Sequence, residues 1–179
     1  MVTRGTTTAT AGTTRTAEER ARRVAADVPD PELPMLTIDD LGILREVHVD
    51  GSGHVDVDIT PTYSGCPALE AIRADVLTRL DEHGMPDATV HVVLSPPWTT
   101  DRISADGIEK LRRHGIAPPG PAGGAHGDGR APVPLALTVR CPRCGSPDTR
   151  ELARFGSTAC KALWVCGDCA EPFDHLKAL

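Results

Sequence analysis

Aromatic residues are scarce in this chain of 179 residues, at 3% of the sequence, with two Trp, one Tyr and two Phe. A hydrophobic core must therefore be built from Val, Leu, Ile and Ala. No apolar run approaches the roughly 18 residues that a membrane-spanning helix requires, which argues against a membrane protein. Hydrophobic residues make up 40% and charged residues 25%, a balance that is typical of a globular chain.

An excess of basic charge is also missing. The formal net charge is −6 at pH 7. Residues 17–117 hold 10 basic and 19 acidic side chains, whereas residues 135–179 hold 6 and 5. Binding to nucleic acid usually needs a basic surface, so the sequence argues against a nucleic-acid partner.

The chain shows no secretory signal, and its six cysteines are not spaced as a disulfide framework. Four of them form two CxxC pairs, which indicates metal or redox chemistry in a reducing cytoplasm. Residues 1–16 contain eight threonines, two arginines and no acidic residue, without a clear amphipathic pattern. We expect this segment to be a disordered tail.

The remaining chain divides at a segment rich in Gly and Pro. Ten of the 18 residues from Ala117 to Pro134 are Gly or Pro, and so few apolar side chains cannot repay the entropy of ordering. We therefore predict a domain over 17–117, a linker over 118–134 and a small module over 135–179. Within them, periodicity and turn residues predict helices at 17–28, 67–83 and 99–114 and strands at 47–49, 54–59, 89–94, 149–155 and 161–165.

Cys66 lies where a predicted strand ends and a predicted helix begins. Pro67 suits the first helical position, which makes Cys66 the predicted N-cap residue. The positive end of the helix dipole would favour a thiolate there, hence a nucleophile or a metal ligand, and Gly65 would let the backbone turn tightly. The alternative is that Cys66 is a small buried side chain without chemistry. The rings of Tyr63 and Trp98, both just past strand ends, either flank Cys66 or cap the core.

The C-terminal module carries the strongest chemical signal. Its two CxxC knuckles lie 21 residues apart, and four thiolates satisfy tetrahedral zinc without an open position. A module of this size cannot bury enough apolar surface to fold unaided, so the metal would supply folding free energy. The same sulfurs could hold iron as in rubredoxin. The four predicted ligands are Cys141, Cys144, Cys166 and Cys169.

These residues together resemble a known family. Asp30-Pro31-Glu32, the turn at 39–42 and the segment Thr62-Tyr63-Ser64-Gly65-Cys66-Pro67 are similar to the small α/β domain of the iron–sulfur assembly family. The segments 95–98 and 155–161 and the appended CxxC module resemble the PaaD branch, whose members are accessory proteins of the bacterial phenylacetyl-CoA epoxidase. The resemblance implies an α+β fold, with a three-stranded α/β domain, helices packed on its sheet, and a C-terminal β zinc ribbon.

The resemblance also implies a role in maturation. Family members assist insertion of iron or an iron–sulfur cluster into the epoxidase, with Cys66 as the reactive position or transient ligand and Asp30, Glu32 and Thr62 as helpers. The implied partners are the oxygenase or reductase subunits, with a homodimer as an alternative, in the cytoplasm. An accessory protein without catalysis of its own is favoured. A structural subunit of the oxygenase and a thiol-dependent enzyme using Cys66 are the alternatives.

Overall fold

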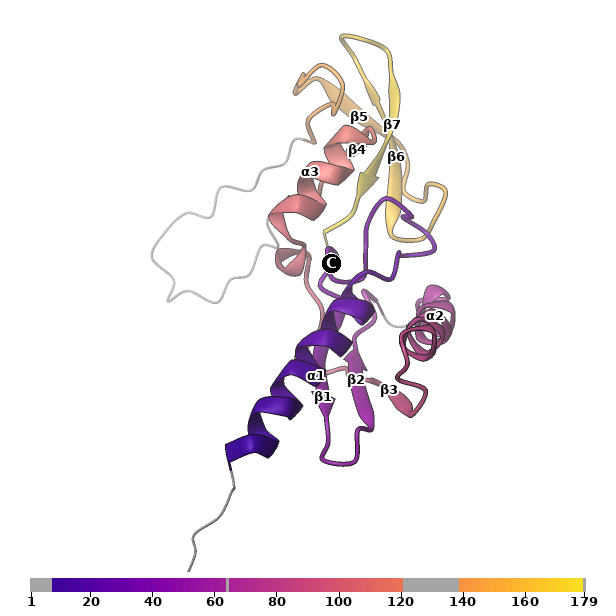
Figure 1. The fold of residues 1–179 in the computed structure, drawn as a ribbon. Coiled ribbons are helices and arrows are strands. Elements are labelled where there is room, and N and C mark those ends of the chain that lie inside the picture. The colour runs from indigo at the N-terminus through magenta and orange to yellow at the C-terminus, as the bar shows by residue number, and fades with distance from the viewer. Residues whose placement is uncertain (1–7, 64, 121–138, 179) are drawn as a thin grey trace, which may run out of the picture. The chain divides into compact units, whose positions relative to one another are not determined.

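The computed structural model describes residues 8–63, 65–120 and 139–178, and it divides the chain into two compact units, 1–98 and 99–179. In the first unit α1 (Thr8–Ala26) precedes β1 (Leu44–Val49) and β2 (Val55–Ile59), and α2 (Ala68–Glu82) connects β2 to β3 (Ala88–Val92). The sheet order is β1-β2-β3, with β1 antiparallel and β3 parallel to β2 (Figure 1). Within the described chain, no helix is long and apolar enough to span a membrane.

One face of this sheet carries the core. Val55, Val57 and Ile59 of β2 are buried, whereas Asp56 and Asp58 between them are partly exposed. This is the alternation expected for a strand with one covered face. Helices α1 and α2 pack against the covered face and against each other. The fully buried side chains that they contribute are Ala21, Ala25, Ile72, Val76 and Leu80.

The second unit is built around a four-stranded sheet in the order β4-β7-β6-β5. After the 3-10 turn η1 (Thr100–Arg102) come α3 (Ala105–Arg113) and β4 (Ile116–Ala117), which runs parallel to β7 (Pro172–Leu176). Strand β6 (Lys161–Cys166) pairs antiparallel with both β7 and β5 (Thr149–Ala153). The fold class expected from the sequence, α+β with a C-terminal β ribbon, is confirmed.

The predicted boundary between the domains is wrong. We expected residues 99–117 to belong with the first domain, but they belong with the ribbon, because Ile116 and Ala117 pair with Asp174 and His175 of β7. The predicted helix at 99–114 is also divided. Ile103 is extended, and α3 begins only after Ser104, whose side chain accepts a hydrogen bond from the Gly107 N–H at 2.9 Å.

Two further expectations near the N-terminus and the linker need revision. Helix α1 begins at Thr8, so residues 8–16 of the predicted disordered tail are helical, and residues 1–7 lie outside the described residues. The reason is that a helix anchored by its buried alanines continues toward the N-terminus at little cost. Of the predicted linker, residues 121–134 also lie outside the described residues.

Candidate functional site: a four-cysteine centre and a strand-end cysteine

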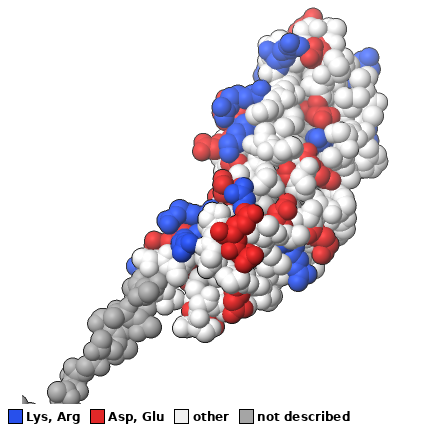
Figure 2. All heavy atoms as spheres, turned by 45° about the vertical axis from the view of Figure 1, so that its right-hand side comes forward, with Lys and Arg blue, Asp and Glu red and all other residues white. Residues whose placement is uncertain are grey.

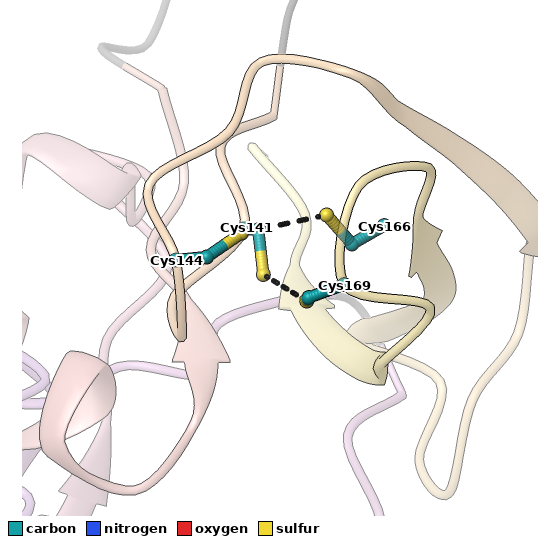
Figure 3. Close-up of side chains that lie close together, drawn as sticks. All are labelled: Cys141, Cys144, Cys166 and Cys169. Atoms are coloured by element: carbon teal, nitrogen blue, oxygen red, sulfur yellow. Dashed lines mark hydrogen bonds between the residues drawn. The ribbon is translucent and has the colours of Figure 1, made fainter.

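The four predicted metal ligands meet in the second unit. The sulfurs of Cys141, Cys144, Cys166 and Cys169 all lie within 4.8 Å of one another (Figure 3). Cys141 and Cys166 are buried and pack with Ala117 and Phe173, while the other two are exposed. The sulfur of Cys144 is 3.6 Å from that of Cys166. Tetrahedral Zn–S bonds of about 2.3 Å would place sulfurs about 3.8 Å apart, so the donor set fits a closed thiolate metal site.

Backbone hydrogen bonds shape the loop of each CxxC pair. In the first, the Gly145 N–H donates to the Cys141 carbonyl at 2.9 Å, and Gly145 takes a left-handed φ of 76°. In the second, the Cys166 N–H donates to the Glu171 carbonyl at 3.0 Å. Glycine suits φ values of this kind because it has no Cβ. Each CxxC pair is therefore shaped by its own loop.

Hydrogen bonds also connect the two CxxC loops. The buried Ser146 hydroxyl donates to the Asp168 carboxylate at 2.5 Å and accepts from the Asp148 N–H at 3.0 Å. The Gly167 N–H donates to the Asp148 carbonyl at 2.7 Å. A Cβ at Gly167 would overlap the Asp148 carboxylate. Any larger residue at this position would require the Asp148 side chain to move.

The thiols of this centre differ in acidity. Backbone N–H donation, chiefly from Cys169, lowers the pKa of Cys166 to about 7. The Ser146 N–H favours the Cys144 thiolate, but desolvation and the neighbouring sulfurs outweigh it and raise its pKa to about 12. The pKa of Cys169 is also raised. Four thiolates cannot coexist so closely without a cation, so metal binding must displace protons from the centre.

Cys66 lies in the first unit, in the connection between β2 and α2. Its N–H donates to the Tyr63 carbonyl at 3.2 Å, and Gly65 before it has a φ of 86°. Helix α2 begins at Ala68 with Pro67 as its N-cap residue, so the prediction of Cys66 as the cap is wrong by one residue. Because Pro67 already has helical φ and ψ, Cys66 lies one step outside the helix, and its side chain is half-buried.

Burial raises the pKa of the Cys66 thiol. The Ala68 N–H acts in the opposite direction, but the charges of Glu32 and Asp30 raise the pKa further, and a hydrogen bond with Thr62 lowers it. The helix N-terminus thus favours the thiolate, as expected, but desolvation and two carboxylates outweigh it, so the expected lowering of the thiol pKa does not occur. The same influences place all three predicted helper residues in the surroundings of Cys66.

A buried aspartate organises the segment that carries these carboxylates. Asp30 Oδ1 accepts the N–H groups of Glu32 at 2.9 Å and Leu33 at 2.8 Å. The Asp30 N–H donates to the Leu36 carbonyl at 2.9 Å. Asp30 therefore fixes the turn that places Glu32. Trp98 is buried and donates from Nε1 to the Leu41 carbonyl at 2.8 Å, so its ring caps the core, as one of the two sequence interpretations had it.

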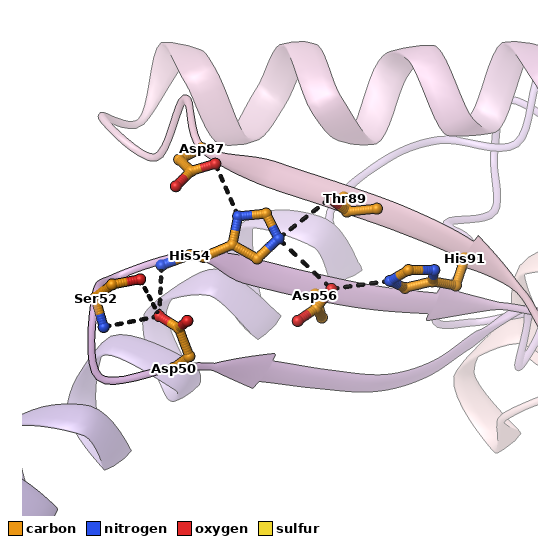
Figure 4. A network of polar contacts seen from close by, with 7 residues as sticks. All are labelled: Asp50, Ser52, His54, Asp56, Asp87, Thr89 and His91. Atoms are coloured by element: carbon orange, nitrogen blue, oxygen red, sulfur yellow. Dashed lines mark hydrogen bonds and ion pairs between the residues drawn. The ribbon is translucent and has the colours of Figure 1, made fainter.

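Sequence reasoning missed a polar cluster on the open side of the first sheet, which Figure 4 shows. His54 contacts Asp87 through Nδ1 at 2.8 Å and Thr89 through Nε2 at 3.1 Å, and His91 Nε2 is 2.8 Å from Asp56. These histidines are scattered in the sequence. The parallel register of β2 and β3 brings them together, and period-two alternation was the one signal that could have placed them on one face.

Together, a small α/β unit with a cysteine between β2 and α2 and a ribbon with four cysteines that can hold a metal ion define a protein of the iron–sulfur assembly class. Residues 18–94 match the family model described as "Iron-sulfur cluster assembly protein", and residues 128–177 match the "PaaD zinc beta ribbon domain". The chain belongs to the PaaD family, which joins these two parts.

Individual relatives agree with this family. The chain is 45% identical over 86% of its length to an Escherichia coli (strain K12) protein named as a subunit of a "Putative 1,2-phenylacetyl-CoA epoxidase", covering 88% of that protein. It is 44% identical over 43% of its length to the Staphylococcus aureus (strain USA300) "Fe-S protein maturation auxiliary factor SufT", of which it covers 88%. A DUF59 domain from Bacillus anthracis superposes with a TM-score of 0.53 at 29% identity, over 56% of this chain and 96% of that one.

Proposed function

We propose that this protein is a maturation factor of a phenylacetyl-CoA 1,2-epoxidase, and that it passes iron or an iron–sulfur cluster to the enzyme through Cys66. The observation that carries the proposal is the environment of Cys66, a half-buried thiol whose pKa is raised by the charges of Glu32 and Asp30 in addition to burial. The names of the relatives support the two halves of the proposal separately, one naming an epoxidase and the other iron–sulfur maturation.

The chemistry of this environment favours an arriving cation. The two carboxylates repel anions. A metal cation, in contrast, neutralises the carboxylates and displaces the proton of the thiol. One sulfur and a few oxygen ligands hold a metal more weakly than a closed four-sulfur site does, so the metal can leave again. Asp30, which fixes the turn, and Glu32 and Thr62 assist in this scheme.

The ribbon has a different task in the same proposal. Its four cysteines hold zinc as a permanent structural ion, because the donor set is complete and leaves no open position for exchange. The bound metal supplies folding free energy to the second unit. In this proposal, the protein contacts the oxygenase or reductase subunits of the epoxidase.

A thiol-dependent enzyme is the less favoured alternative. A nucleophilic cysteine needs its thiolate stabilised by a neighbouring base or cation, whereas both charged influences on Cys66 are acidic and raise its pKa. The structural-subunit alternative has a different expected outcome, since an inert Cys66 could be replaced without loss.

Replacing Cys66 tests the proposal. The Cys66→Ala variant, co-produced with the epoxidase subunits, is expected to fold and to retain one metal per chain in the ribbon while epoxidase activity and iron content fall to the level without the factor. Metal analysis of anaerobically purified protein and phenylacetyl-CoA consumption are the measurements. Cys160→Ala is the matched control, because Cys160 is the other cysteine outside the four-cysteine centre. A fully active, iron-loaded epoxidase made beside Cys66→Ala would overturn the proposal and favour a structural role.

A further inference from the structure

Strand β5 presents an unusual surface at the edge of the second sheet. It is the last strand of the order β4-β7-β6-β5, and the residues from Arg150 to Phe155 are all exposed. Leu152 is 45% exposed and Phe155 is 65% exposed. Only Val92 and Leu94 are comparable large hydrophobic residues in the described chain. Two exposed apolar side chains three residues apart on an edge strand make this edge a candidate contact site for a partner.

The turn that carries Phe155 is held in place. Lys177 Nζ lies 4.5 Å from the centre of the Phe155 ring and donates to the Arg154 carbonyl at 3.3 Å. The Gly156 N–H donates to the Lys161 carbonyl at 2.8 Å. These bonds fix the backbone on both sides of the ring, so the ring is presented with little freedom left to lose on binding.

A buried ion pair supports the same turn from beneath. Lys161 is 6% exposed and its Nζ lies 3.5 Å from Asp174, which the Ser157 hydroxyl also contacts at 3.4 Å. A Cβ at Gly156 would come within 3.0 Å of the Asp174 carboxylate. The glycine therefore lets the turn lie directly on the ion pair. This construction holds a large apolar ring at the surface, where it is 65% exposed.

Basic residues flank the two apolar side chains along the chain. Arg150 and Arg154 make no ion pair with any residue that the structure describes, and Lys177 lies over the ring. Glu151 is the one acidic residue among 150–155. The charge that would complement this surface is negative.

Addition of a partner strand is not the mode of contact that β5 favours. The pairing of β5 with β6 shifts register between Glu151 and Ala153, which is a β-bulge. Bulges on edge strands bend the ladder and discourage pairing with another strand. Recognition at this edge therefore depends on side chains.

We propose that Arg150, Leu152, Arg154, Phe155 and Lys177, here called the β5 surface, dock an acidic surface of a partner protein that presents apolar side chains between its carboxylates. Nucleic acid is the competing class of ligand. It is disfavoured because an aliphatic side chain sits within the surface and because the ribbon, residues 135–179, holds 6 basic against 5 acidic residues, which is far from a basic module.

The test uses the full, metal-loaded chain labelled with ¹⁵N. The probe is a synthetic peptide in which Glu alternates with Leu and Phe, compared with a peptide of equal length and charge containing Ser in place of Leu and Phe, and with a short DNA duplex. We expect saturable amide shifts confined to the β5 surface with the first peptide, and weaker binding as salt rises.

Two double variants separate charge from apolar contact. Arg150→Glu/Arg154→Glu and Leu152→Ser/Phe155→Ser are each expected to weaken binding about tenfold or more. Their matched controls are Arg112→Glu/Arg113→Glu, exposed arginines of α3, and Val92→Ser/Leu94→Ser, whose exposed fractions of 41% and 68% match those of the replaced pair. The controls are expected to bind like the original chain.

Three results would overturn the proposal. They are an absence of saturable shifts with the acidic apolar peptide, equal loss of binding in the control variants, and tighter binding of the DNA duplex than of the peptide. If a double variant loses its metal, the single variants Arg150→Glu and Phe155→Ser carry the same comparison, since each changes one exposed side chain.

Discussion

Cys166 and Cys66 carry the same thiol group, and their surroundings change its acidity in opposite directions. Backbone N–H groups of a tight loop lower the pKa of Cys166 to about 7, so it offers a thiolate to an arriving metal near neutral pH. Desolvation, with the charges of Glu32 and Asp30 added, raises the pKa of Cys66, which stays protonated until a cation displaces the proton. The difference separates a permanent metal site from a proposed transfer site.

Proton competition at the four-cysteine centre has a measurable consequence. Each metal–sulfur bond requires a thiolate, so acidification returns protons to the sulfurs and releases the metal. We expect one metal per chain after dialysis against metal-free buffer at neutral pH and progressive loss as the pH falls. Metal analysis across the series checks this, and retention that does not change with pH would contradict it. Cys144→Ser is expected to hold less metal than the original chain at every pH.

Gly167 is the residue whose replacement should disturb the centre most directly without removing a ligand. A Cβ there overlaps the exposed Asp148 carboxylate, which must move aside, so Gly167→Ala is expected to destabilise the metal-loaded protein by about 1 kcal/mol, the lower end of what overpacking costs. Denaturant unfolding followed in the ribbon measures this.

The control is Gly51→Ala, where no atom lies within 4 Å of the added Cβ, with an expected change within about 0.5 kcal/mol. Adding Asp148→Ala to Gly167→Ala removes the clashing carboxylate and should recover part of the loss. A Gly167→Ala variant as stable as the Gly51→Ala control would contradict the packing argument.

Among the elements, β2 and β3 are connected by side chains as well as by their ladder. The Asp87 hydrogen bond raises the pKa of His54, and the His91 hydrogen bond lowers the pKa of Asp56. The cluster lies on the open side of the sheet (Figure 4). On the face drawn in Figure 2, the Lys and Arg side chains of the described residues likewise lie among Asp and Glu side chains. The strands are thus joined by paired charges.

The pH dependence of this cluster has a definite sign. A pKa raised on folding means that the folded chain binds the proton more tightly. Its stabilising contribution is therefore complete below the ordinary histidine pKa of 6.5 and is lost as the pH rises through the higher folded value. We expect His54→Gln to lower the melting temperature of the first unit more below pH 6.5 than well above it. The control is His114→Gln, on the residue that ends α3, and a difference for His54→Gln that grows with pH would contradict the assignment.

For the molecule as a whole, the boundary between the units is the feature most open to test. Because β4 pairs with β7, α3 and β4 should depend on the metal as the ribbon does. We expect a strong chelator to remove hydrogen-exchange protection from residues 105–117 together with residues 149–176, while β1, β2 and α2 keep theirs. Exchange measured by mass spectrometry on the full chain checks this. Continued protection of residues 105–117 in the chelated chain would place them with the first unit, as the sequence suggested.

Much of this architecture could be predicted from local patterns. The alternation in 55–59 and the helical spacing of Ile72, Val76 and Leu80 predicted β2 and α2, because side-chain period follows directly from backbone geometry. Two CxxC pairs predicted the metal centre, because thiolate spacing is itself the ligand chemistry. The family resemblance added the helper residues, and all three lie around Cys66.

Sequence by itself determined the covered face of the first sheet, the four metal ligands and the position of Cys66 between β2 and α2, since each depends on residues near one another in the chain. Tertiary structure decided the rest. Strand β4 has two residues, too few for any period, and only its pairing with β7 assigns it to the ribbon. The pKa of Cys66 was likewise beyond local reasoning, because Asp30 and Glu32 act on it through space from a segment more than 30 residues away, and desolvation exists only once the chain has folded.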